Sequence, residues 1–70
     1  MLRFTQEQLT VPARAVAKAS GLAPSLITIE EDASGTIHGH FRAQLVASGS
    51  LETVIVAVSL AANEYKRMAG

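Results

Sequence analysis

The sequence predicts a small α+β protein in which a β-hairpin is flanked by two helices, an αββα order. A helical pattern with recognisable caps covers residues 5–21, and residues 26–46 alternate between polar and apolar with period two. A second, strongly apolar helical pattern covers residues 51–69. With 70 residues in all, the chain is expected to form a single domain over residues 1–70 with one small core.

The first helix begins with a capping signal. Thr5 and Gln8 have the spacing of a capping box. A proline inside a helix removes a hydrogen bond and clashes with the carbonyl four residues back. We therefore expect a short turn at residues 6–9 and a separate main helix from Pro12 to Ser20.

Glycine and proline define the end of this helix. Gly21 suits the left-handed position after the last helical residue, and Pro24 follows soon after. Small residues share the expected buried face of the helix: Ala13, Val16, Ala17 and Ser20. At the other end, residues 2–4 alternate and permit a short N-terminal edge strand.

The middle of the chain separates apolar from polar residues by parity. The odd-numbered positions carry Ile27, Ile29, Ile37, Phe41, Ala43 and Leu45. The even-numbered positions carry Thr28, Glu30, Asp32, Thr36, His38, His40, Arg42 and Gln44. Because successive strand residues point to opposite faces, two strands at residues 26–31 and 36–46 would each have one apolar and one polar face.

The turn between these strands fixes their register. A three-residue loop, Ala33–Ser34–Gly35, pairs residues of equal parity and keeps both apolar sets on one face. It also places Gly35 where this loop type needs a positive φ. The predicted pairs are Ile27 with Phe41, Thr28 with His40, and Glu30 with His38.

The last segment has helical capping and charge signals. Ser50 suits the N-cap, Glu52 the first turn, and Lys66 with Arg67 the last turn. Apolar residues recur at helical spacing: Leu51, Val54, Ile55, Val58, Ala61, Ala62, Tyr65 and Met68. The β-branched run at residues 53–60 also fits a buried strand, and the sequence leaves that alternative open.

A second apolar stripe on this helix predicts self-association. Val56 and Leu60 lie mostly outside the first stripe, and one hairpin face can cover only one stripe. A chain this small with no Cys also lacks disulfides as a source of stability, which favours oligomerisation. We expect a homodimer whose interface contains Val54, Ile55, Val56 and Leu60.

Composition excludes or disfavours several classes of function. The absence of Cys excludes a disulfide scaffold, a thiolate nucleophile and a Cys-ligated metal. Six basic and six acidic residues give a net charge of zero, which disfavours nucleic acid or an anionic membrane as partner. The N-terminus shows no apolar leader and no run is long enough to span a membrane, so a cytoplasmic protein is expected.

The polar hairpin face carries a candidate metal site. His38 and His40 leave the same face of a strand and Glu30 lies opposite, so these three could hold a divalent metal. A solvated polar face explains the same residues without a metal, and we expect neither metal nor cofactor. No nucleophilic or acid–base set stands out, so an enzyme is not expected.

Two short stretches resemble nucleic-acid-binding families. Residues 16–25 resemble the second helix and turn of helix-turn-helix repressors, but residues 26–32 are β-branched and acidic where a recognition helix should follow. Gly35–His38, Phe41 and Ala61–Ala62 resemble the double-stranded-RNA-binding domain, which has a helix, a strand meander and a final helix. That family's basic residues at the start of the last helix are replaced by Leu51–Val54, and membership of neither family is inferred.

We therefore predict a non-enzymatic protein–protein interaction module: a small dimeric regulator, inhibitor or adaptor, of the size that phages and mobile elements often encode. Its partner-binding residues would be Arg14, Lys18, His38, His40 and Arg42. The first alternative is a DNA-binding transcriptional regulator with a degenerate helix-turn-helix at residues 13–31, and the second is a metal-binding module.

Overall fold

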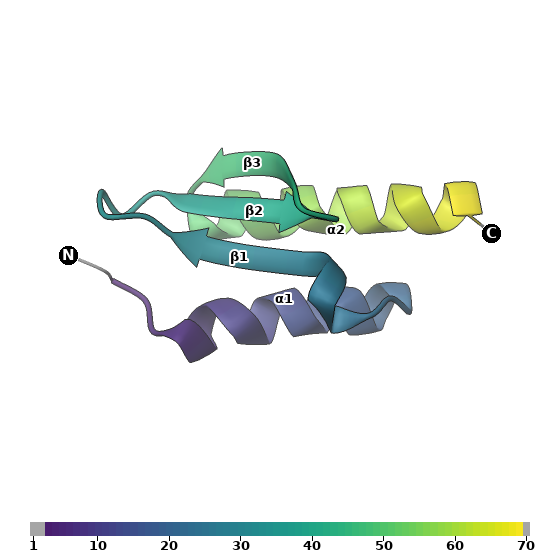
Figure 1. The fold of residues 1–70 in the computed structure, drawn as a ribbon, viewed down its shortest axis with the longest axis horizontal. Coiled ribbons are helices and arrows are strands. Elements are labelled where there is room, and N and C mark those ends of the chain that lie inside the picture. Colours follow the sequence, from purple (N-terminus) through teal and green to yellow (C-terminus); the bar gives the residue numbers. More distant parts are fainter. Residues whose placement is uncertain (1–2, 70) are drawn as a thin grey trace.

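A computed structural model describes residues 3–69 of the chain and confirms the α+β class. Its elements are α1 (Gln6–Ser20), a 3₁₀ turn (Pro24–Leu26), β1 (Ile27–Glu31), β2 (Ile37–Phe41), β3 (Gln44–Gly49) and α2 (Leu51–Ala69) (Figure 1). The sheet thus has three strands where the sequence predicted two.

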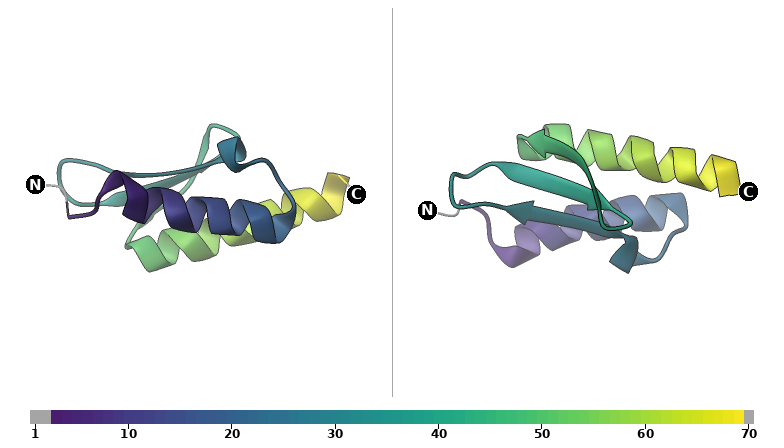
Figure 2. Two further views of the ribbon diagram at one scale, coloured as in Figure 1. Left: turned by 90° about the horizontal axis from the view of Figure 1, so that it is seen from below. Right: turned by 45° about the horizontal axis from the view of Figure 1, so that its top comes forward.

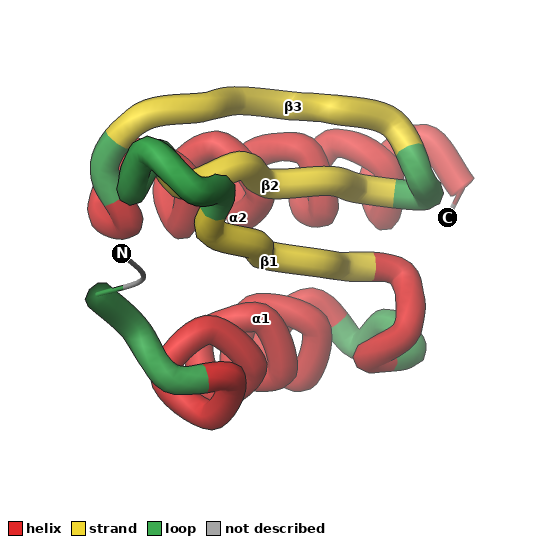
Figure 3. The backbone as a smooth tube through the Cα atoms, turned by 60° about the vertical axis from the view of Figure 1, so that its left-hand side comes forward, coloured by secondary structure: helices red, strands yellow, loops and turns green. Residues whose placement is uncertain are grey.

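The molecule has two layers. The strands form an antiparallel sheet in the order β1-β2-β3, and both helices pack on one of its faces, α1 against β1 and α2 against β2 and β3. The two helices lie side by side and run in the same direction (Figures 1 and 2). No helix or strand formed by residues 3–69 covers the other face of the sheet (Figure 3).

The first hairpin has the predicted register. Ile27 pairs with Phe41, Thr28 with His40, and Glu30 with His38. Gly35 closes the three-residue loop with φ +88°, and the Asp32 N–H donates to the Thr36 carbonyl at 3.0 Å. Loop chemistry and side-chain parity therefore select the same pairing.

The second hairpin corrects the expectation of one strand over residues 36–46. Arg42 and Ala43 both have positive φ, +55° and +67°, and form a two-residue turn between β2 and β3. Ala43 is therefore exposed in the turn, and Leu45 pairs with His40 on the uncovered face of the sheet. The prediction that both lie on the buried face was wrong.

Contacts from distant segments hold this turn in place. The Arg42 guanidinium carbon lies 4.8 Å from the centroid of the Tyr65 ring, and the Phe41 ring meets Tyr65 edge-on at 5.4 Å. The Arg42 N–H donates to the Leu26 carbonyl at 2.9 Å. Neither central residue is a usual turn former, so the turn depends on these tertiary contacts.

Strand β3 carries a β-bulge. Gly39 pairs with Ala47 but His40 pairs with Leu45, which leaves Val46 unpaired. The extra residue shifts the register of β3 by one, so parity arguments that hold for β1 and β2 do not carry through it.

Helix α1 is continuous, which corrects the expected break at Pro12. Both hydrogen bonds of the capping box are present: Gln8 N–H to Thr5 Oγ1 at 3.1 Å, and Thr5 N–H to Gln8 Oε1 at 2.8 Å. Leu9 and Ala13 are buried on either side of the proline. The cap and this burial offset the hydrogen bond that Pro12 cannot make.

Residues 3–5, which precede α1, do not form a strand. The Arg3 and Phe4 N–H groups donate instead to the Glu31 carboxylate at 2.9 to 3.0 Å. Leu2, the remaining residue of the expected edge strand, lies outside the described residues. Glu31 therefore ties the start of the described chain to the end of β1.

Helix α2 packs closely on the centre of the sheet. Val54, Val58 and Ala62 have no exposed surface, and the helix excludes the alternative of a strand at residues 53–60. A Cβ placed on Gly39 would lie 2.5 Å from Val54 Cγ1 and 2.9 Å from Val58 Cγ1. Glycine at this position is what allows α2 to approach β2.

Among the described residues, neither helix combines the length and apolar character required to cross a membrane.

Candidate functional site

The outer side of α2 presents two large aliphatic side chains. Val56 is 55% exposed and Leu60 is 65% exposed. They lie one turn apart and point away from the side occupied by Val54, Val58 and Ala62, as the helical period requires. Large apolar groups arranged in this way on a small protein suit a contact with another molecule.

The other two residues predicted for the interface belong to the monomer's own core. Val54 is completely buried beneath the sheet, so it has no surface to offer a partner. Ile55 is half-buried and packs against the core. Of the four residues predicted for the interface, Val56 and Leu60 are exposed on the outer side of the helix, whereas Val54 is buried and Ile55 is half-buried.

Helix α1 has a similar outer side. Val11 is 58% exposed, and Ala15, one turn further, is also exposed. Because both helices lie on one face of the sheet, their outer sides form a continuous surface, which we call the helix face. Its large exposed apolar residues are Val11, Val56 and Leu60.

The two helices also share a charge pattern. In α1, Glu7 lies in the first turn and Lys18 in the last; in α2, Glu52 lies in the first turn and Lys66 with Arg67 in the last. Each arrangement stabilises the helix, since acidic groups favour its N-terminus and basic groups its C-terminus. Because the helices are parallel, the two patterns add instead of cancelling.

The molecule is consequently polarised along its long axis of 41 Å. The acidic end carries Glu7, Glu30 and Glu52; the basic end carries Lys18, Arg42, Lys66 and Arg67. Lys66 Nζ lies 3.8 Å from the Cβ position of Gly21, which shows that the C-terminal ends of α1 and α2 adjoin. Arg3 and Glu64 are the exceptions, each lying toward the end of opposite sign. The net charge of zero conceals this separation.

The uncovered sheet face holds a hydrogen-bonded network around His38. Its Nε2 lies 2.7 Å from Asp32 Oδ2 and its Nδ1 lies 2.6 Å from Ser48 Oγ. A carboxylate only accepts, so Nε2 carries a hydrogen and donates it to Asp32. The Ser34 hydroxyl donates to Asp32 Oδ1 at 2.6 Å. Hydrogen bonds from Ser34, and secondarily from His38, hold the pKa of Asp32 well below its usual range.

Asp32, His38 and Ser48 are the residue types of a catalytic triad, but their surroundings favour a structural role. An activated serine also needs donors aimed at an oxyanion and a site that excludes water. Here the His38 and Asp32 side chains are 30% and 41% exposed, and Ser48 is exposed on an edge strand. We interpret the network as a clamp that joins the β1–β2 loop to β3.

The network was missed at the level of sequence because it depends on the second hairpin. Asp32 and His38 were both assigned to the polar face, and the pairing of Glu30 with His38 is confirmed. Ser48 comes beside His38 only when β3 folds back on β2. The His38 ring therefore contacts the Asp32 carboxylate, although its register partner in β1 is Glu30, and no contact between a basic side chain and a carboxylate in salt-bridge range besides this one is found among residues 3–69.

The candidate metal residues share a face but do not form a metal site. His38, His40 and Glu30 all lie on the uncovered side of the sheet. Both ring nitrogens of His38 already have partners, and no group of three or more acidic or His residues within 3–69 is arranged to hold a metal ion.

The five residues predicted to bind a partner do not form one surface. Arg14 and Lys18 are exposed on α1, whereas His38 and His40 lie on the opposite face of the molecule. Arg42 lies at the basic end and stacks on Tyr65. The structure therefore divides the predicted set between two faces and one end.

The segment predicted as a degenerate helix-turn-helix, residues 13–31, does not have that structure. Residues 27–31, where a recognition helix would lie, form β1. The observed order of a helix, three strands and a helix does agree with that of the double-stranded-RNA-binding domain. However, α2 begins at the acidic end, with Glu52 in its first turn, so this agreement concerns element order and not phosphate binding.

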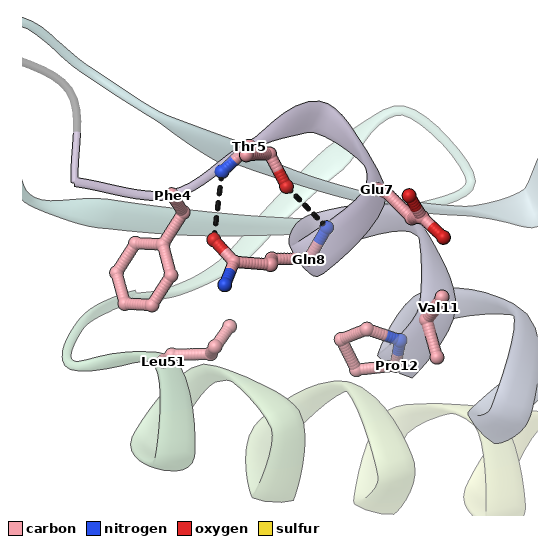
Figure 4. A pocket seen from close by; sticks show the side chains of 7 residues that line it. All are labelled: Phe4, Thr5, Glu7, Gln8, Val11, Pro12 and Leu51. Atoms are coloured by element: carbon pink, nitrogen blue, oxygen red, sulfur yellow. Dashed lines mark hydrogen bonds between the residues drawn. The ribbon is translucent and has the colours of Figure 1, made fainter.

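A recess of about 460 Å³ lies where the starts of the two helices meet. Figure 4 shows its lining residues: Phe4, Thr5, Glu7, Gln8, Val11, Pro12 and Leu51. The Thr5 hydroxyl and the Gln8 side-chain carbonyl are already engaged in the capping box. Glu7 is the charged residue of the lining. The recess extends the helix face toward the acidic end and brings together no catalytic set.

Comparison with known proteins gives no relative: no family model matches the sequence, and no curated protein or solved structure matches the chain significantly.

Proposed function

We propose that this chain is a non-enzymatic protein-interaction module that forms a homodimer through its helix face. The observation that carries the proposal is the exposure of Val56 and Leu60, 55% and 65%, on a helix whose opposite side is completely buried. Fully burying one Val or Leu side chain contributes about 1.5–3 kcal/mol. In a two-fold dimer each residue is buried twice, which offsets part of the entropy lost on association.

As a dimer the module would act as a small regulator, inhibitor or adaptor. The uncovered sheet face, with Thr28, His40 and Leu45, stays accessible for a protein partner when the helix face is occupied. The His38 clamp supports this role because it rigidifies that face, and a preorganised surface loses less entropy on binding.

Two leucines of similar exposure provide a matched test. Leu60 on α2 is 65% exposed and Leu45 on the sheet face is 61% exposed. We expect light scattering at micromolar concentration to give the mass of two chains for the wild type and for Leu45→Asp. Leu60→Asp should give the mass of one folded chain, with the helical signal in circular dichroism retained.

A wild-type chain that scatters as a single copy would contradict the proposal. So would a dimer that survives Leu60→Asp but dissociates with Leu45→Asp, since that result would place the contact on the sheet.

A further inference from the structure

We propose that the second copy binds antiparallel, with the acidic end of each chain against the basic end of the other and with α1 included in the contact. This inference rests on the proposed function, because it describes the orientation and extent of the same interface. Three features of the structure support it: the area of the helix face, the charge polarity of the chain and the arrangement of residues along α2.

The area required for a stable dimer brings α1 into the interface. Helix α2 has 19 residues and is therefore about 28 Å long. A strip of that length and about 10 Å wide offers roughly 300 Å², whereas a stable interface buries about 800 Å² on each partner. Val11 and Ala15 on the outer side of α1 extend the apolar surface beside Val56 and Leu60.

The charge polarity selects between two possible two-fold arrangements. An axis parallel to the helices would place Glu7 and Glu52 beside the same residues of the second copy, and like charges would meet at both ends. An axis perpendicular to the helices places Glu52 near Lys66 and Arg67 of the second copy. Charges around an interface act mainly on orientation and on the exclusion of wrong arrangements. The perpendicular axis is therefore favoured.

The outer side of α2 has the sequence order that such a dimer needs. Glu52, Val56, Leu60 and Arg67 follow one another along it, an acidic residue first, aliphatic residues in the middle and a basic residue last, and Glu64 on the same side departs from this order. When α2 of a second copy lies antiparallel to it, Glu52 of each copy lies near Arg67 of the other, and Leu60 lies near the two-fold axis.

The absence of native Cys allows the orientation to be measured by cross-linking. Thr53 and Glu64 are exposed and lie three turns apart on the same side of α2. In an antiparallel dimer Thr53 lies opposite Glu64 of the second copy. We expect Thr53→Cys chains mixed with Glu64→Cys chains to give far more dimer with a short bismaleimide than either variant alone. The same two Cys variants with the added Leu60→Asp substitution, which should keep the chain monomeric, measure the background level of cross-linking.

A charge exchange gives an independent test. Arg67→Glu introduces like charges at two symmetric contacts and should weaken self-association roughly tenfold in sedimentation equilibrium, since exposed pairs are individually weak. Adding Glu52→Arg restores opposite charges in the antiparallel dimer and should restore the affinity. In a parallel dimer the double variant would still repel itself.

The outcomes separate this inference from the proposed function. Efficient cross-linking of each Cys variant to itself, in a chain that light scattering shows to be dimeric, would overturn the antiparallel orientation and leave the dimer standing. A monomeric wild type with cross-linking at the background level would overturn both.

Discussion

The two hairpins of the sheet share strand β2 but are closed by different forces. The β1–β2 loop is closed locally: Gly35 supplies the positive φ, and Asp32 accepts hydrogen bonds from the N–H groups of Ser34 and Thr36 at 2.9 and 3.1 Å. The β2–β3 turn has positive φ at two residues with side chains, Arg42 and Ala43. It is held from outside, by contacts with the 3₁₀ turn and α2.

The difference shows what each hairpin depends on. The first can form from its own residues, because the loop satisfies its backbone groups and needs no strained conformation. The second holds two non-glycine residues in the left-handed region, which costs about 1–2 kcal/mol per residue. The contacts of Arg42 and Phe41 with the Tyr65 ring offset this cost, so we expect β3 to be stable only when α2 is in place.

The largest effect is expected at the strand that both hairpins share. Gly39→Ala would place a methyl group 2.5 Å from Val54 Cγ1 and force α2 away from β2. We expect a loss of about 2–3 kcal/mol in the free energy of unfolding, measured with urea. Val54→Ala in the same chain makes room for the new methyl group. The double variant should therefore be less destabilised than the sum of the two single variants, and simple additivity would argue against a clash.

Exchanging glycine and alanine between the two turns should have opposite effects. Gly35→Ala puts a side chain at φ +88° and should cost about 1–2 kcal/mol of stability. Ala43→Gly relieves strain at φ +67° and should stabilise the protein by about 0.5–1 kcal/mol, net of the extra entropy of the unfolded chain. Urea denaturation of both variants tests the contrast. Destabilisation by Ala43→Gly would mean that the second turn is not strained.

The smallest effect is the response of the first hairpin to acid. The pKa of Asp32 is lower in the folded chain than in the unfolded chain, mainly through Ser34 and then His38. Its stabilising contribution is therefore fully present above the unfolded pKa of about 3.9 and is lost progressively as the pH falls from there through the lower folded pKa. Asp32→Asn should be less stable than the wild type at neutral pH, and the difference should shrink in acid.

The exposure of Asp32 keeps this effect modest. Ser34→Ala removes the leading cause of the lowered pKa, so its stability should depend on acid less than that of the wild type. A stability gap between wild type and Asp32→Asn that stays constant down to pH values well below 3.9 would contradict the assignment.

The contrast between the hairpins also explains which features the sequence could predict. Parity and Gly35 predicted the first register, because both signals are local. Arg42–Ala43 has no turn signal, so β3 and the position of Ser48 beside His38 were missed. The helical period predicted the exposure of Val56 and Leu60. It also led to the assignment of Val54 to the interface. The helical period shows which residues share a side of the helix, but not which side the sheet will cover.

The remaining errors have similar causes. Pro12 argued for a break in α1, but the burial of Leu9 and Ala13 on either side is a tertiary effect that overrides it. A net charge of zero carries no spatial information. The separation of charge emerges only when both helices are seen to begin at the same end of the molecule.

The bulge at Val46 has a further consequence for the behaviour of the protein at high concentration. The outer edge of β3 offers unpaired backbone groups to other chains, with Leu45 and Val46 exposed beside them. A flat edge of this composition would act as a template on which further strands could add without limit. A β-bulge increases the local twist and interrupts the regular hydrogen-bonding repeat. We therefore expect the bulge at Val46 to guard this edge against polymerisation while leaving the helix face free.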